Sequence, residues 1–301
     1  MKPDHESSRA GRESCFCDGG PSRGEAGVPA LLKAAPDPYF CGIKMNETPP
    51  PRWILWGHLS AKGTSPAPTL IHFGADILNL LAREDFNKVG FILQRYGYQS
   101  VAHDSLCYGF DLKPGEKEGL PGWRQRIEKG EPLLEDFASK TSHLLDHLIQ
   151  EGYTDPNRVI ACGSCRGGFL ALHWAAREPR VKCVVAFTPL TDPRIVTEFA
   201  GMENTAALGA LAIHNYVDKL ADRAVWACLG NQDDRVSTEN CLRFMRKLMD
   251  AAIARNQSRP GADKNKPANV EFHLSSVVGH STYALAHEEA ASWVLAQMGR
   301  A

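Results

Sequence analysis

Residues 158–168 read Arg-Val-Ile-Ala-Cys-Gly-Ser-Cys-Arg-Gly-Gly. An apolar run over 158–162 predicts a buried strand, and helical spacing over 167–176 predicts a helix directly after it. Gly163 and Gly167 therefore flank Cys165 at a strand–turn–helix junction. A turn this tight leaves no room for side chains two positions before and after its centre. The central residue then adopts a strained conformation with its side chain exposed.

The register of the two glycines decides which residue occupies the centre of the turn. If Ser164 were central, the flanking positions would be Cys162 and Arg166. Arg166 is too bulky for that position, so the register favours Cys165. A thiol placed there would be activated by an imidazole and by the positive end of the following helix. The alternative is a glycine-rich turn with a buried structural cysteine.

Outward from this junction, strands and helices alternate. This alternation predicts an α/β fold, a mainly parallel sheet with helices on both faces. The segments between them are a long irregular loop over 110–132 and a mixed helical insert over 191–223. The expected strands are 53–59, 69–74, 98–104, 158–162, 181–187, 224–229 and 270–276, and the expected helices are 78–96, 134–150, 167–176, 237–255 and 283–299.

The chain has 301 residues, of which the first fifty differ in composition from the rest. Residues 1–50 are rich in Gly, Pro, Ser and charges, which predicts a disordered leader. Residues 51–301 then form a single domain, with 191–223 as a small lid-like insert over the pocket. Apolar side chains of this insert either contact an apolar part of the substrate or are ordinary core: Leu208, Leu211, Ile213 and Tyr216.

Charge and cysteine usage exclude several classes of partner. Lys and Arg number 34 and Asp and Glu 35, so the basic excess typical of a nucleic-acid-binding protein is lacking. No apolar run approaches the roughly 18–20 residues of a membrane span, and residues 1–23 lack the apolar region of a secretory signal. The nine cysteines are odd in number and too sparse for a disulfide scaffold, which favours reduced thiols. We expect a cytoplasmic protein that needs no metal and no cofactor; the oligomeric state stays open.

Two further segments hold the residue types that would complete a nucleophilic site. The strand over 224–229 is followed by Gly230 and, three residues later, by Asp233, which we prefer over Asp234 as the acid. His280 lies in a glycine-bounded loop after the last strand. The chain order of nucleophile, acid and histidine fits a hydrolase site built at the ends of parallel strands. The alternatives are an acidic surface turn and an ordinary loop histidine.

The loop after the strand over 69–74 supplies a third element. A backbone N–H of Ala75, together with that of Arg166, would form an oxyanion hole beside Cys165.

The segment 163–172 resembles the G-x-S-x-G-G stretch of prolyl-oligopeptidase-like hydrolases and esterases in the α/β-hydrolase superfamily, and 230–236 resembles their acid loop. The resemblance covers residues 52–299. It implies Cys165 as nucleophile, His280 as base and Asp233 as the residue that orients the imidazole. The family normally has Ser at the nucleophile position; Cys there is similar to dienelactone hydrolases, which cleave lactones.

The chain has no room for the large propeller domain of prolyl oligopeptidases. We therefore expect a hydrolase that cleaves a carboxylic ester, lactone or thioester of a small molecule through an acyl-enzyme. One alternative is a catalytically inactive, hydrolase-like binding or scaffold protein. A second is a small peptidase of the prolyl-oligopeptidase type.

Overall fold

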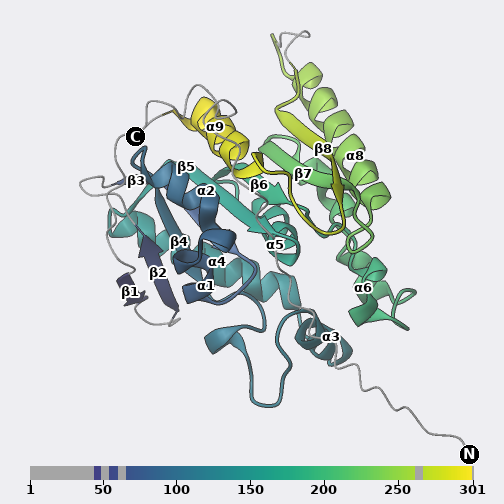
Figure 1. Cartoon of the computed structure of the whole chain (residues 1–301). Coiled ribbons are helices and arrows are strands. Elements are labelled where there is room, and N and C mark those ends of the chain that lie inside the picture. The colour runs from purple at the N-terminus through teal and green to yellow at the C-terminus, as the bar shows by residue number, and fades with distance from the viewer. Residues whose placement is uncertain (1–43, 49–53, 60–65, 262–266, 300–301) are drawn as a thin grey trace, which may run out of the picture.

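An eight-stranded sheet forms the centre of the protein (Figure 1), and its strands lie in the order β1-β2-β4-β3-β5-β6-β7-β8. The computed structural model describes residues 44–48, 54–59, 66–261 and 267–299. The first two strands of that order pair antiparallel, β1 with β2 and β2 with β4, and all other pairs are parallel. The strands are β1 (Lys44–Glu47), β2 (Leu55–Leu59), β3 (Ala67–Phe73), β4 (Gln99–His103), β5 (Thr154–Ser164), β6 (Val181–Phe187), β7 (Ala224–Gln232) and β8 (Val270–Val278). The expected mainly parallel sheet is confirmed.

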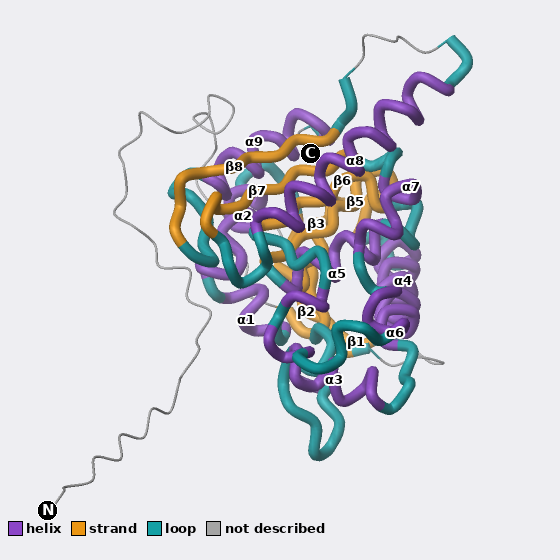
Figure 2. The backbone as a smooth tube through the Cα atoms, turned by 90° about the vertical axis from the view of Figure 1, so that its right-hand side faces the viewer, coloured by secondary structure: helices purple, strands orange, loops and turns teal. Residues whose placement is uncertain are grey.

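Helices cover both faces of this sheet (Figure 2). Leu70 packs in a core cluster with side chains of α2 and α9, whereas its neighbour Ile71 packs in a second cluster with side chains of α4, α5 and α8. Successive residues of a strand point to opposite faces, so these two clusters lie on the two sides of the sheet. The helices are α1 (Ile77–Ala82), α2 (Glu84–Gln94), α3 (Leu120–Glu128), α4 (Leu133–Gln150), α5 (Arg166–Ala175), α8 (Thr238–Ser258) and α9 (Ala286–Met298).

The apolar patterns in the sequence correspond to this burial. Residues 183–187 of β6 are all buried, as a parallel strand covered on both faces requires. The helix expected over 134–150 is α4 (Leu133–Gln150), and its predicted apolar face, which includes Phe137, Leu144 and Leu148, is buried. Within the described part of the chain, no helix is both long enough and apolar enough to cross a membrane.

Two expected elements differ in the structure. The single helix expected over 78–96 is two helices, because Arg83 has extended backbone angles (φ −94°, ψ 127°) between α1 and α2. The loop expected over 110–132 contains α3. Its Gly119 is the N-cap with φ 65°, and Pro121 lies in the first turn. Gly and Pro therefore mark the start of a helix here rather than an irregular segment.

The leader expected over 1–50 falls mostly outside the described residues. Its last part is an exception, because Lys44–Glu47 form β1. This strand pairs with β2, so the segment expected over 53–59 as an edge strand lies one position inside the sheet.

The insert over 191–223 connects β6 to β7 and consists of short helical pieces. Two of its apolar side chains, Leu208 and Ile213, are fully buried in the core cluster shared with α4, α5 and α8. Of the two readings left open for these residues, ordinary core applies to this pair. The pieces are 3₁₀ helices at Pro193–Ile195, Thr197–Phe199 and Ile213–Tyr216 and the helices α6 (Ala206–Ala210) and α7 (Val217–Leu220).

Candidate active site

Cys165 lies between the end of β5 and the start of α5, in a conformation that L-residues rarely adopt (φ 52°, ψ −118°). The flanking glycines are required by contact. A Cβ on Gly163 would lie 2.3 Å from the carbonyl carbon of Gly167, and one on Gly167 would lie 2.0 Å from the carbonyl oxygen of Phe73. The turn therefore has Cys165, and not Ser164, at its centre.

Asp233 and His280 lie in the loops after β7 and β8, and His280 Nδ1 is 2.8 Å from Asp233 Oδ2. The carboxylate is almost fully buried, and its other oxygen accepts hydrogen bonds from the backbone N–H groups of Arg235 and Val236. The neighbouring Asp234 is exposed. The choice of Asp233 over Asp234 therefore agrees with the contact geometry.

His280 also forms a side-chain hydrogen bond with Cys165. Burial alone would raise the pKa of the Cys165 thiol. It is outweighed by that hydrogen bond, by the charges of His280 and Arg166 and by the backbone N–H of Arg166, which together lower the pKa. Burial opposes the charged form of His280 too, but the hydrogen bonds to Asp233 and Cys165 raise its pKa. The pair is thus biased toward thiolate and imidazolium.

The other buried histidines differ from His280. Burial lowers the pKa of His72 to about 4, although a hydrogen bond from its Nδ1 to Asn87 Oδ1 opposes this shift. Burial likewise lowers the pKa of His103 and of His173. These imidazoles are held neutral, whereas His280 is set up to carry a proton.

The two N–H groups expected to form an oxyanion hole have different surroundings. The N–H of Arg166 faces the sulfur of Cys165. Ala75 lies two residues after the end of β3 and is buried in a small core cluster with α1. Within the described residues the N–H of Ala75 makes no hydrogen bond, whereas that of Gly74 is bound to the Ser105 hydroxyl at 2.8 Å.

A cavity opens beside Cys165. It is bordered by residues from β3, α1, α2, the turn between β5 and α5, and the loops after β6 and β8. The segment expected to act as a lid, 191–223, contributes no described residue to it, because its apolar side chains pack into the core. Ala75 does not line it either. The lining residues are His72, Phe73, Gly74, Leu80, Asp85, Phe86, Ser164, Cys165, Arg166, Thr188 and His280.

Several of these lining residues were not predicted from the sequence to belong to the site. Thr188 follows β6 with φ 41°. The sequence could have indicated Thr188, because the predicted parallel strands β5 and β6 are neighbours and end at the same edge of the sheet. Leu80 and Phe86 lie on either side of the break at Arg83, which periodicity alone did not show.

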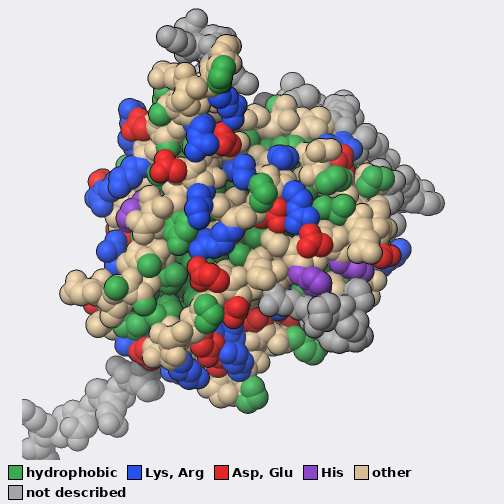
Figure 3. Space-filling model, turned by 180° about the vertical axis from the view of Figure 1, so that it is seen from behind, with side chains coloured by type: hydrophobic (Ala, Val, Ile, Leu, Met, Phe, Trp, Pro, Cys, Tyr) green, Lys and Arg blue, Asp and Glu red, His purple; other side chains and the backbone are tan. Residues whose placement is uncertain are grey.

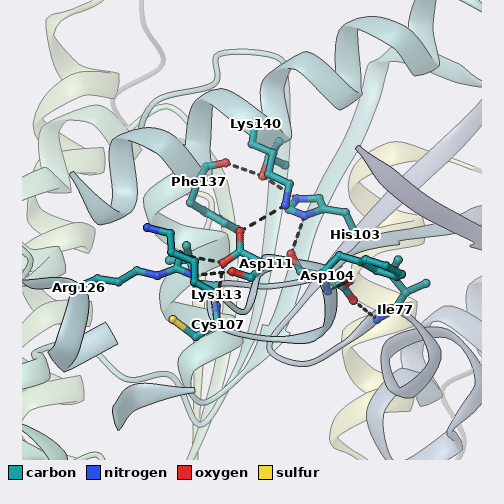
Figure 4. Close-up of polar contacts among 12 residues, drawn as sticks. Ile77, His103, Asp104, Cys107, Asp111, Lys113, Arg126, Phe137 and Lys140 are labelled. Carbon is teal, nitrogen blue, oxygen red and sulfur yellow. Dashed lines mark hydrogen bonds and ion pairs between the residues drawn. The ribbon is translucent and has the colours of Figure 1, made fainter. Parts of the chain in front are cut away.

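The loop between β4 and α3 is held by two carboxylates, of which Asp104 is buried and Asp111 is half-buried (Figure 4). Asp104 accepts hydrogen bonds from the backbone N–H groups of Ile77 and Phe110. Asp111 accepts from the N–H of Cys107 and forms an ion pair with Arg126 at 2.8 Å. These contacts fix the segment that contains Tyr108, whose ring lies against the Arg166 side chain with 5.0 Å between the guanidinium carbon and the ring centroid.

No group of three His, Cys, Asp or Glu side chains in the described ranges is arranged to hold a metal ion.

On the face drawn in Figure 3, Lys and Arg side chains are interspersed with Asp and Glu side chains. The six cysteines in the described part of the chain are buried free thiols. Burial raises the pKa of Cys107, Cys162, Cys183 and Cys241. Cys165 differs from these four in the direction of its shift.

Comparisons with known proteins define the class. The sequence profile described as "Prolyl oligopeptidase family" matches residues 123–293, more than half of the chain. The chain belongs to this family and has the α/β-hydrolase fold. No curated protein matches the chain in sequence.

Solved structures share the fold at low sequence identity. A candidate dipeptidyl aminopeptidase IV from Bacteroides ovatus matches with a TM-score of 0.64 at 14% identity, over 87% of this chain and 36% of that one. Porphyromonas gingivalis dipeptidyl peptidase 4 matches with 0.61 at 16%, over 86% and 36%. A candidate dienelactone hydrolase from Klebsiella pneumoniae matches with 0.60 at 18%, over 87% of this chain and 100% of that one. The chain thus spans about a third of the two peptidases and the whole length of the third protein.

Proposed function

We propose that this protein hydrolyses a carboxylic ester, lactone or thioester through a covalent intermediate on Cys165. The observation that carries the proposal is the continuous hydrogen-bonded chain from Asp233 through His280 to Cys165, whose thiol sits at the centre of the strained turn. Nucleophile, base and orienting acid in contact are the arrangement that covalent acyl transfer needs.

In the first half-reaction, the Cys165 thiolate attacks the carbonyl carbon and a C–S bond forms. The carbonyl electrons move onto oxygen, where the N–H groups of Arg166 and Ala75 stabilise the charge. The intermediate then collapses, the C–O bond to the leaving group breaks, and His280 gives its proton to the departing oxygen. Asp233 keeps the imidazole oriented through the contact of its carboxylate with Nδ1.

In the second half-reaction, water attacks the thioester while neutral His280 takes its proton. The C–S bond breaks, the acid is released, and the proton returns the pair to its starting state. The same cycle opens a lactone, whose alcohol stays attached to the released acid. Every group in it is a side chain or backbone N–H of this chain, so the proposal requires no cofactor.

Esters are favoured over amides for a chemical reason. A thiolate leaves a tetrahedral intermediate readily, so an intermediate formed from an amide returns to substrate unless the nitrogen is protonated first. The full-length structural likeness to the Klebsiella candidate dienelactone hydrolase supports the same reading. The family and the two peptidase structures make a small peptidase the second candidate.

The test compares p-nitrophenyl esters, an aryl thioester and aminoacyl p-nitroanilides with the wild type, Cys165→Ala, Cys165→Ser and Ser164→Ala. We expect ester or thioester turnover that falls by about 10³-fold or more in Cys165→Ala. Anilide turnover above that of the esters would favour the peptidase. Equal rates for the wild type and Cys165→Ala, or a larger loss in Ser164→Ala, would overturn the proposal.

A further inference from the structure

Arg166 places a positive charge at the cavity without an acidic partner. It borders the same cavity as Cys165 and His280. Its Nε is buried and has no hydrogen-bond partner among the described residues. No carboxylate in the described ranges lies within ion-pair distance of its guanidinium, which instead rests on the face of the Tyr108 ring.

Three other arginines that are buried or partly buried pair with carboxylates, whereas Arg223, which does not border this cavity, also has a buried Nε without a partner among the described residues. Arg126 is paired with Asp111 and Glu116, Arg180 with Glu178 and Asp146, and Arg235 with Glu198. A buried N–H without an acceptor costs free energy. Arg166 differs from Arg223 because it borders the cavity beside Cys165 and His280, so a molecule in that cavity can supply its acceptor.

The guanidinium is held in place before any ligand arrives. The guanidinium carbon lies 5.0 Å from the centroid of the Tyr108 ring, a cation–π contact that supplies no oxygen acceptor to its N–H donors. Tyr108 itself lies in the loop that Asp104 and Asp111 hold by hydrogen bonds to Phe110 N–H and Cys107 N–H. A planar fork fixed in this way suits a carboxylate, which it can bind through two parallel hydrogen bonds.

The other charged groups around the cavity are already compensated. Asp85 borders it, but Arg83 binds that carboxylate through Nε at 3.0 Å. Asp233 is bound by His280 and by two backbone N–H groups. His72 is neutral at pH 7. The charge left for a ligand is therefore the positive one of Arg166.

We infer that Arg166 binds a carboxylate of the substrate next to the scissile carbonyl, so that the protein acts on anionic esters such as half-esters of dicarboxylic acids. This inference rests on the proposed function for its reaction and on the unpartnered guanidinium for its substrate class. Arg166 would then act twice, through its backbone N–H on the oxyanion and through its side chain on specificity.

The experiment uses the full chain and pairs of substrates that differ only in charge. The p-nitrophenyl half-esters of succinate, glutarate and adipate are each compared with the p-nitrophenyl ester whose second carboxylate is a methyl ester. Spontaneous hydrolysis is subtracted from every rate. The proteins are the wild type, Arg166→Gln, Arg166→Lys and the control Arg246→Gln, which alters an exposed i,i+4 pair with Asp250. The readout is the ratio of kcat/KM for the anionic ester to kcat/KM for the neutral one.

We expect a ratio of at least tenfold for one chain length in the wild type and in Arg246→Gln. It should fall at least tenfold in Arg166→Gln, mainly through KM, and partly recover in Arg166→Lys. A ratio near one in the wild type, or an equal ratio in Arg166→Gln, would overturn the inference while leaving ester hydrolysis in place.

If the wild type hydrolyses no ester faster than Cys165→Ala, the proposed function fails, and calorimetric titration decides the inference separately. Glutarate should then bind the wild type at least tenfold more tightly than Arg166→Gln, and glutaramide should not bind. Equal affinities, or no binding of the dicarboxylate, would overturn it.

Discussion

Asp233 Oδ2 and His280 Nδ1 lie 2.8 Å apart although 47 residues separate them in the sequence. The fold makes this contact possible because β7 and β8 are neighbouring parallel strands, so the loops after them meet at one edge of the sheet. Asp233 is held by two backbone N–H groups, and it in turn orients His280.

Asp233→Asn should therefore lower kcat for ester hydrolysis by about 10²–10⁴-fold, because an amide does not hold the imidazole in the same tautomer or stabilise its charged form. The matched control is Asp234→Asn, since Asp234 is adjacent, acidic and exposed. Its kcat should stay within about twofold of the wild type, as expected for a surface substitution. Similar losses in both variants would contradict the role of Asp233.

Alkylation of Cys165 by iodoacetamide should report its lowered pKa. The thiolate is the reactive form, so labelling of Cys165 should remain fast at pH values where an ordinary cysteine, with a pKa of about 8.5, is protonated. In His280→Ala the apparent pKa of labelling should rise, because the hydrogen bond and the charge that lower it are gone. Peptide mass spectrometry as a function of pH measures both.

Cys107 and Cys162 serve as internal controls in that experiment, because burial raises the pKa of each. They should stay unlabelled while the native fold persists. An unchanged pH profile for Cys165 in His280→Ala would show that the imidazole does not activate the thiol.

Gly167→Ala should destabilise the fold by more than about 2 kcal/mol, since its Cβ would lie 2.0 Å from a backbone oxygen that cannot move independently. Gly209→Ala is the matched control. It is also a helical glycine, and its nearest atom, Arg194 Nη1, would be 3.7 Å away. That control should gain about 0.5–1 kcal/mol from helix propensity. Urea unfolding of the three proteins measures both effects, and equal stabilities would refute the steric account of the turn.

Arg126→Met should cost about 1–3 kcal/mol, because it removes the ion pairs of Arg126 with Glu116 and Asp111. Glu116 then keeps only the backbone N–H of Lys113, and Asp111 keeps the N–H of Cys107 and the ammonium of Lys140. Arg246→Met, which breaks an exposed pair, should cost under about 0.5 kcal/mol. The measurement is again the free energy of unfolding.

The ion pair between Arg126 and Glu116 predicts a pH dependence of the free energy of unfolding. Hydrogen bonds from Arg126 lower the pKa of Glu116 from 4.5 to about 2. A lowered pKa in the folded state gives stability that is present above pH 4.5 and is lost as the pH falls toward 2. The stability difference between the wild type and Arg126→Met should therefore shrink over that interval, and a constant difference would contradict the assignment.

The sequence predicted most of the sheet because parallel strands are continuous apolar runs. Residues 181–187 and the start of β7 were placed correctly for this reason. The break at Arg83 and the start of α3 at Gly119 were not predicted. In both places the backbone departs from a helix through local φ and ψ values, which apolar periodicity does not encode.

The candidate site was predicted in the same uneven way. The spacing of Gly163 and Gly167 around Cys165 is a local steric requirement, so one sequence sufficed to propose it. Residues such as Thr188 and Phe86 border the cavity only because strands and helices distant in sequence are packed together. Arg166 was singled out for its N–H, and its unpartnered guanidinium became visible only when the surrounding carboxylates were placed.

The most direct test of the central claim is to detect the acyl group on Cys165 itself. A reactive ester is mixed with the wild type, quenched with acid within seconds and digested, and the peptide containing Cys165 is examined by mass spectrometry. The account predicts one acyl group on Cys165, formed at least as fast as turnover and absent in Cys165→Ala. Turnover with no acyl group on this cysteine, or with the group on another residue, would contradict it.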